Sequence, residues 1–122
     1  MKKLKKFGFF QELEHGEPEG ESINSFMRDA PLANSAKIVE YLKSGELLIA
    51  CPGVAHDVLD KSKPLIGSPS VLTDGVWAWP GDLSYYVGKY NLDIPQEMEQ
   101  NMATNGWQVP KQEIDVLDLE LL

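Results

Sequence analysis

The residue types of a nucleophile and a general base lie close together at Cys51 and His56. A catalytic thiol needs a cationic and partly exposed setting, because only its thiolate is a good nucleophile. In this chain Cys51 ends an apolar segment, and the carboxylates of Asp57 and Asp60 would raise the pKa of a nearby thiol. We therefore interpret Cys51 as a buried structural cysteine and expect no catalytic residue.

Metal ligation is the other chemistry that His56, Asp57 and Asp60 suggest. The chain contains only two histidines, His15 and His56, and it has neither an HExxH motif nor an EF-hand loop. Glycine-rich phosphate loops are absent from the sequence as well. Turn-forming side chains in a loop explain the segment around His56 more simply than a metal site does. We expect no metal and no cofactor.

Aromatic residues concentrate between Thr73 and Tyr90, in the segment TDGVWAWPGDLSYYVGKY. Because side chains alternate across a strand, Trp77 and Trp79 share one of its faces. Tryptophan and tyrosine are frequent both in cores and in binding hot spots. The two tryptophans therefore either pack beneath the following helix or form an exposed anchor for a partner. Tyr85 falls toward the outer side of that helix.

The helices that would position these residues follow from apolar periodicity and from turn signals. Four helices are predicted, over residues 22–29, over 35–43, from 82 to 90, and from 95 to a cap at Gly106. Ser22 is the expected N-cap of the first helix. Gly45 lies just after the end of the second, where a glycine commonly stops a helix.

The strands are predicted from short apolar runs. The segment ELLIAC, residues 46–51, predicts a buried strand. Asp74-Gly75 lies between apolar runs at residues 70–73 and 76–79, which is a strong signal for a β-hairpin. Residues 5–13 form either a first strand or an irregular segment. The tail alternates imperfectly, so it forms either an edge strand or a docked helix.

The length of 122 residues and the hydrophobic content of 43% fit one domain with a real core. We predict a single small α+β domain over residues 1–122. Its sheet is antiparallel with three to five strands, and its helices pack mainly on one face. Residues 12–21 form an acidic exposed loop, and residues 111–122 form an acidic tail whose structure the pattern leaves open.

The formal net charge is −8, from 19 acidic and 11 basic residues. Nucleic-acid backbones and anionic lipids repel such a chain, so we expect neither nucleic acid nor a membrane as a partner. A basic protein fits better, because opposite potentials speed encounter and favour the correct pairing. The competing explanation is that the charge only keeps the protein soluble.

The cellular compartment is predicted from the cysteine content and the N-terminal segment. A single cysteine excludes an internal disulfide and fits a reducing compartment. The segment MKKLKKFGFFQELEH begins with lysines, but its apolar run is shorter than the roughly 7–15 residues of a signal peptide. The sequence also has no run of about 20 apolar residues that would span a membrane. We expect a cytoplasmic protein.

The block TDGVWAWPGDLSYYVGKYNLDIP resembles a pattern in small bacterial proteins. In that pattern a Thr-Asp-Gly turn leads to an aromatic strand ending in Trp-Pro, and a DLxYYVxKY helix follows. The upstream pattern VxxYLxxGxxLxAxPG…D also matches, between Val39 and Asp57, so that the resemblance covers roughly residues 36–106. It implies an immunity protein of a polymorphic-toxin or contact-dependent-inhibition system. It carries over no catalytic residue.

The first hypothesis is therefore a non-enzymatic immunity protein that binds a cognate, basic toxin domain and occludes its active site. The contacts are expected from the acidic segments and from the aromatic block: Glu12, Glu14, Glu17, Glu19, Glu21, Asp57, Asp60, Trp77, Trp79 and Tyr85. A second hypothesis is a general interaction or scaffold module that forms a homodimer. A third is a small enzyme or ligand-binding domain with a pocket lined by His56, Asp57 and Trp79.

Overall fold

The computed structural model describes residues 2–13, 16–17, 19–30, 32–50, 53–110 and 119–121. Its main sheet has five strands in the order β2-β5-β6-β1-β7. These strands are β1 (Lys2–Lys6), β2 (Glu46–Ile49), β5 (Val71–Thr73), β6 (Trp77–Pro80) and β7 (Leu119–Leu121). A separate two-stranded sheet consists of β3 (Ala55–His56) and β4 (Leu65–Gly67).

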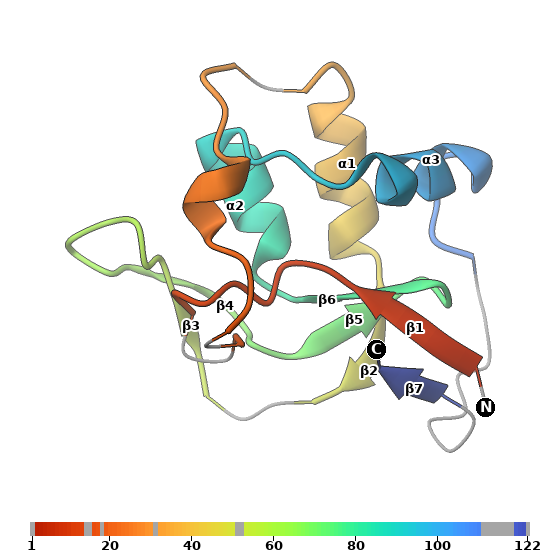
Figure 1. Ribbon diagram of the computed structural model, residues 1–122, viewed down its shortest axis with the longest axis horizontal. Coiled ribbons are helices and arrows are strands. Elements are labelled where there is room, and N and C mark those ends of the chain that lie inside the picture. The colour runs from red at the N-terminus through yellow and green to blue at the C-terminus, as the bar shows by residue number, and fades with distance from the viewer. Residues whose placement is uncertain are drawn as a thin grey trace.

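The helical elements of the described chain are the 3₁₀ helix η1 (Ile23–Phe26) and the α-helices α1 (Ser35–Lys43), α2 (Leu83–Tyr90) and α3 (Gln96–Thr104). Figure 1 shows α1, α2 and α3 together on one side of the main sheet, with both chain ends near β1 and β7. The prediction of a single α+β domain is confirmed, and three of the four predicted helices lie where apolar periodicity placed them.

The first predicted helix is shorter than expected. Of residues 22–29, only Ile23–Phe26 are helical, as one 3₁₀ turn. Ser22 is its N-cap as predicted, because its hydroxyl accepts a hydrogen bond from the Asn24 N–H at 3.3 Å. Only Ile23 of this short element is buried, so packing offers little to extend the helix.

The sheet is mixed, which corrects the prediction of an antiparallel one. The strands β2, β5 and β6 are antiparallel, but β1 runs parallel to both β6 and β7. The hairpin signal describes only neighbours in sequence, whereas β1 and β6 are joined by a long segment that contains η1 and α1. A long connection allows either strand direction, so local turn chemistry does not determine it.

The hairpin joins β5 to β6 at the predicted place, but its turn is wider than Asp74-Gly75. Thr73 lies opposite Ala78 in the ladder. One carboxylate oxygen of Asp74 accepts hydrogen bonds from the backbone N–H groups of Val76 at 2.9 Å and Trp77 at 2.7 Å. The Asp74 side chain thus replaces backbone pairing inside the turn.

The second carboxylate oxygen of Asp74 ties the hairpin turn to two helices. It accepts hydrogen bonds from the Tyr41 hydroxyl of α1 at 2.6 Å and from the Asn101 amide of α3 at 2.9 Å. Asn105 in turn donates to the Tyr41 hydroxyl at 2.9 Å. Burial, followed by the Asp74 hydrogen bond, raises the pKa of Tyr41 well above its ordinary range. Tyr41 therefore remains a neutral donor.

The core lies between the sheet and the helices, and it contains both tryptophans of the hairpin. Trp79 is 0% exposed and Trp77 is 7% exposed. The indole N–H of Trp79 donates to the Leu42 carbonyl of α1 at 3.0 Å. Ala78 faces the opposite side of the sheet, where it packs in a smaller cluster with Leu4 and Val71. The sequence left open whether the two tryptophans are core residues or an exposed anchor. Their burial shows that they belong to the core.

The segment predicted as a buried strand is instead the edge strand β2. It ends at Ile49, and Cys51 lies outside the described residues. Leu47 is 57% exposed and Ile49 is 42% exposed. A short apolar run fits a central strand and an edge strand equally well, so the position of β2 depends on the rest of the sheet.

A glycine lies just after α1 and another after α3, and each is needed for a different reason. Gly106, with φ +67°, ends α3 as predicted, with hydrogen bonds from the Gly106 N–H to Ala103 and from the Trp107 N–H to Met102, both at 2.9 Å. Gly45 follows α1 without a left-handed φ. Its role is close packing, because a Cβ there would lie 2.7 Å from Cζ2 of Trp79 and 2.9 Å from Cβ of Leu72.

Replacing Gly45 by alanine is expected to destabilise the fold by about 1–3 kcal/mol, because the added methyl group overpacks the Trp79 indole. Gly88→Ala is the matched control, since a Cβ at Gly88 meets only Val39 at an ordinary 3.6 Å. In the helix interior this change should stabilise by about 0.5–1 kcal/mol. Urea denaturation measures both values. Equal midpoints for the two variants would contradict the packing role of Gly45.

Candidate functional site

The acidic segment predicted as a loop is held against the chain that leaves β1. The backbone N–H of Gln11 donates to the Glu21 carbonyl at 3.0 Å, and the N–H of Glu17 donates to the Phe9 carbonyl at 3.2 Å. The N–H of Gly20 closes a turn on the Glu17 carbonyl at 2.8 Å. The described part of the loop is therefore anchored at several points, and Glu17, Glu19 and Glu21 have exposed side chains.

Glu12 differs from the other acidic residues of the loop because its carboxylate turns inward. It accepts hydrogen bonds from the Ser22 hydroxyl at 2.5 Å and from the Ile23 N–H at 2.8 Å. Burial raises the pKa of Glu12, but these two hydrogen bonds outweigh it and hold the pKa below its ordinary value. Glu12 thus caps the start of η1. Glu14, the remaining predicted contact in this segment, lies outside the described residues.

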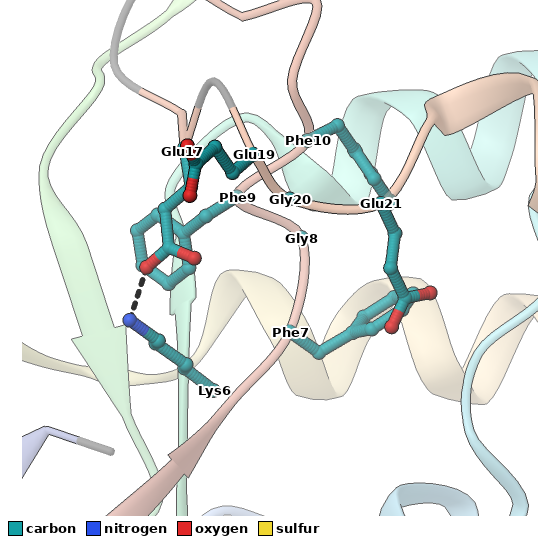
Figure 2. Close-up of a pocket in the computed structure, with 9 residues that line it drawn as sticks. All are labelled: Lys6, Phe7, Gly8, Phe9, Phe10, Glu17, Glu19, Gly20 and Glu21. Atoms are coloured by element: carbon teal, nitrogen blue, oxygen red, sulfur yellow. Dashed lines mark hydrogen bonds and ion pairs between the residues drawn. The ribbon is translucent and has the colours of Figure 1, made fainter.

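A pocket of about 310 Å³ opens beside this loop (Figure 2). The residues that line it come from the end of β1, from the segment after it and from the acidic loop: Lys6, Phe7, Gly8, Phe9, Phe10, Glu17, Glu19, Gly20 and Glu21. The ammonium group of Lys6 forms an ion pair with the Glu17 carboxylate. Three predicted contact residues therefore surround one concave surface with an aromatic lining.

Asp57, another predicted contact, is fully buried. One carboxylate oxygen accepts hydrogen bonds from the hydroxyls of Tyr85 at 2.7 Å and Tyr90 at 2.6 Å. The other accepts from the backbone N–H groups of Leu59 at 2.8 Å and Asp60 at 3.2 Å. Burial raises the pKa of Asp57, but the hydrogen bonds from Tyr90, Tyr85 and Leu59 outweigh it, so the pKa lies below its ordinary value.

The tyrosines of α2 clamp the loop that contains Asp57. The Tyr86 hydroxyl accepts from the Val58 N–H at 3.0 Å and donates to the His56 carbonyl at 3.1 Å. Burial, followed by the hydrogen bond to Asp57, raises the pKa of Tyr90 to about 12. The three tyrosines of α2, Tyr85, Tyr86 and Tyr90, therefore attach this loop to the helix.

Lys89 closes the outer side of the clamp. It donates to the Tyr85 hydroxyl at 2.9 Å, and its ammonium lies 3.5 Å from the Asp57 carboxylate and 3.7 Å from that of Asp60. It also lies 5.4 Å from the ring centroids of both Tyr85 and Tyr90, in cation–π geometry. Tyr85 is thus half-buried in a network that already uses its hydroxyl.

The structure divides the predicted contact residues into two groups. Asp57, Trp77 and Trp79 are buried, so a partner cannot reach them without opening the core. For the two tryptophans the sequence left core and exposed anchor as alternatives, and their burial excludes the exposed anchor. Glu17, Glu19, Glu21, Asp60 and Tyr85 keep exposed or half-exposed side chains.

The pocket expected around His56, Asp57 and Trp79 does not correspond to the one beside the acidic loop, which none of the three residues lines. Among the described residues, no group of three or more histidine, cysteine, aspartate or glutamate side chains is arranged to hold a metal ion.

Sequence reasoning missed two features of the surface. One is the part that Lys6 and the three phenylalanines of residues 7–10 play in the pocket. Their position beside the acidic loop was the available signal, but the lysines entered the prediction only through a signal peptide, which the short apolar run argued against. The other is the exposed edge of β2, because the run ELLI was read as buried.

Asp57→Asn is expected to destabilise the protein by about 1.5–3 kcal/mol at neutral pH, because it removes a charged acceptor from four hydrogen bonds. The folded-state pKa of Asp57 is below its unfolded value of 3.8. The carboxylate therefore stabilises the fold above that value, and this contribution is lost as pH falls through the folded pKa. The difference between wild type and variant should shrink in acid.

Thermal unfolding followed from neutral pH down to about pH 2 measures this effect, since the range crosses the titration of aspartate. Asp29→Asn, at an exposed position, is the control and should change stability by less than about 0.5 kcal/mol. A gap between wild type and Asp57→Asn that stays constant over the whole pH range would contradict the assigned role of the carboxylate.

Comparison with known proteins gives no relative for this chain: no family model, no curated protein and no solved structure matches it. None of the helices in the described ranges combines the length and the apolar character that crossing a membrane requires. The function must therefore be inferred from the anchored acidic loop, the pocket beside it and the sequence pattern itself.

Proposed function

We propose that this protein is a non-enzymatic, cytoplasmic immunity protein that binds a basic toxin domain and occludes its active site. The observation that carries the proposal is the anchored acidic loop, which presents Glu17, Glu19 and Glu21 around a pocket. The resemblance of residues 36–106 to immunity proteins of polymorphic-toxin systems supports the same assignment. Occlusion needs a complementary surface and no reacting group on the inhibitor.

Electrostatics supports a basic partner. The chain carries a net charge of −8, which attracts a positively charged protein from a distance and raises the association rate. Within the described residues, Glu17 is the one of the three pocket glutamates whose carboxylate forms an ion pair, and its partner is Lys6. A toxin that acts on nucleic acid needs a basic active-site surface, and an acidic inhibitor complements that surface.

Anchoring of the loop supports tight binding. A loop that is disordered before binding loses conformational freedom on association, and this loss weakens affinity. Here the loop backbone is already hydrogen-bonded to Phe9 and Gln11, and Glu12 joins it to η1. Folding therefore already orders the loop that carries the carboxylates, so the loop loses less conformational entropy on binding.

Neutralising Glu17, Glu19 and Glu21 together, each by substitution with glutamine, is expected to weaken binding of the cognate toxin domain at least about tenfold. The loss should fall largely on the association rate and should shrink as salt is raised, because both effects come from charge attraction. Toxin domains encoded beside the gene are the candidates to test by co-expression, and surface plasmon resonance then gives both rates.

A control with the same change in net charge combines Asp29→Asn, Glu40→Gln and Glu97→Gln at exposed positions away from the pocket. Glu97 pairs with Lys5 at 3.4 Å on the surface, and an exposed pair of this kind contributes little to stability. The control should change affinity much less than the pocket variant does. If no encoded toxin is bound or neutralised, the proposed function fails.

Self-association is the second candidate function, and the exposed edge of β2 favours it. In the described part of the chain no strand pairs with the outer side of β2, and Leu47 and Ile49 are exposed beside it. Two such edges can pair antiparallel about a two-fold axis to form a continuous sheet. Each copy carries the same net charge of −8, which opposes this pairing.

Sedimentation velocity over a range of protein concentrations tests this candidate. If β2 pairs with itself, added salt strengthens the dimer by screening like charges, and Leu47→Lys abolishes it. Leu65→Lys is the control, because Leu65 is 67% exposed on the separate β3–β4 sheet. A protein that stays monomeric at millimolar concentration in high salt eliminates the candidate and leaves the immunity function unaffected.

A further inference from the structure

We propose that the pocket beside the acidic loop receives an arginine side chain of the partner protein, and that Lys6 occupies the Glu17 carboxylate until the arginine displaces it. This inference rests on the proposed function and deepens it, since it names the chemical group that the acidic surface recognises. The arginine site itself can be tested with a small arginine derivative, without the toxin.

The volume and lining of the pocket fit a long cationic side chain. Its volume of about 310 Å³ leaves room for such a group. Phe7, Phe9 and Phe10 are among the lining residues; the side chains of Phe7 and Phe10 are buried in the core, and that of Phe9 is half-buried beside the pocket. A planar guanidinium stacks favourably on aromatic faces, which a compact, strongly hydrated ammonium does less well. The aromatic lining therefore favours arginine.

The charges around the pocket favour a cation. Three of the lining residues, Glu17, Glu19 and Glu21, carry carboxylates, and one of them, Lys6, carries an ammonium group that pairs with Glu17. Figure 2 shows the Glu17 and Lys6 side chains meeting at one side of the pocket, while Glu21 extends along the other. The carboxylates in the described residues are not grouped closely enough to hold a metal ion. A guanidinium with five donors can instead bridge separated acceptors.

Lys6 shows that the pocket already accommodates a cationic group of a side chain. Its ion pair with Glu17 is partly exposed, at 32% for Lys6 and 49% for Glu17. Exposed ion pairs contribute only about 0–1 kcal/mol, so a better-matched cation can displace the ammonium. The Lys6 ammonium thus competes with the partner's arginine for the Glu17 carboxylate. Removing it should strengthen the binding of an added arginine.

The test titrates the full chain with N-acetyl-arginine methylamide and follows backbone and phenylalanine resonances by NMR. The matched neutral probe is N-acetyl-citrulline methylamide, which has the same shape without the charge. We expect saturable shifts at Phe9 and at the neighbouring Gly8 and Gly20 with arginine, and binding at least about tenfold weaker with citrulline, as expected when a charge-assisted contact is lost.

Three variants sharpen the test. Glu19→Gln combined with Glu21→Gln should weaken arginine binding, and both positions are exposed, so the fold should be retained. Lys6→Met should strengthen it about two- to fivefold, the range that corresponds to the loss of one exposed ion pair. Glu40→Gln, on the outer surface of α1, is the control and should leave binding unchanged.

Equal shifts with arginine and citrulline would overturn the inference, as would weaker arginine binding by Lys6→Met. The two proposals fail in different ways. If a toxin is bound and neutralised but the arginine probe does not distinguish wild type from the Glu19 and Glu21 variant, only the pocket inference fails. If the probe binds as expected but no encoded toxin is bound, the immunity function fails and the arginine site remains.

Discussion

The buried carboxylate of Asp74 is the interaction on which the arrangement of this domain depends. It accepts hydrogen bonds from two backbone N–H groups of its own turn, from Tyr41 of α1 and from Asn101 of α3. A buried charge that loses its partners is strongly destabilising, so hairpin, α1 and α3 must meet in one geometry. Packing of Trp79 against α1, with Gly45 making room for the indole, then completes the core.

A second buried aspartate, Asp57, uses the same chemistry in the loop after β3. Asp57 gathers the hydroxyls of Tyr85 and Tyr90 and thereby attaches the loop after β3 to α2. The aromatic segment of residues 73–90 therefore serves mainly to build the fold. In the described part of the acidic loop, the side chains of Glu17, Glu19 and Glu21 are exposed, and backbone hydrogen bonds to Phe9 and Gln11 hold this part of the loop in place. The buried aspartates that stabilise the fold are thus distinct from the exposed glutamates to which we assign recognition.

Sequence patterns predicted correctly those elements whose structure depends on residues close together in the chain. The hairpin, α1, α2, α3 and the caps at Ser22 and Gly106 depend on turn chemistry, periodicity and backbone freedom within a few residues. The candidate site was predictable only in part: the exposed acidic loop follows from its composition, but the inward turn of Glu12 and the pocket beside Phe9 do not. Both depend on contacts with elements whose position the loop sequence does not encode.

The sequence by itself determined the α+β class, the acidic character and the places of most helices. Helices depend on patterns among neighbouring residues, and net charge is a sum over the residues of the chain. Tertiary structure decided that β1 runs parallel to β6, that β2 lies at an edge, and that Trp79 and Asp57 are buried. The side-chain hydrogen bonds that hold Trp79 and Asp57 in place join residues 28 to 37 positions apart. Exposure of a side chain depends on which distant element covers it, and only the folded chain brings those elements together.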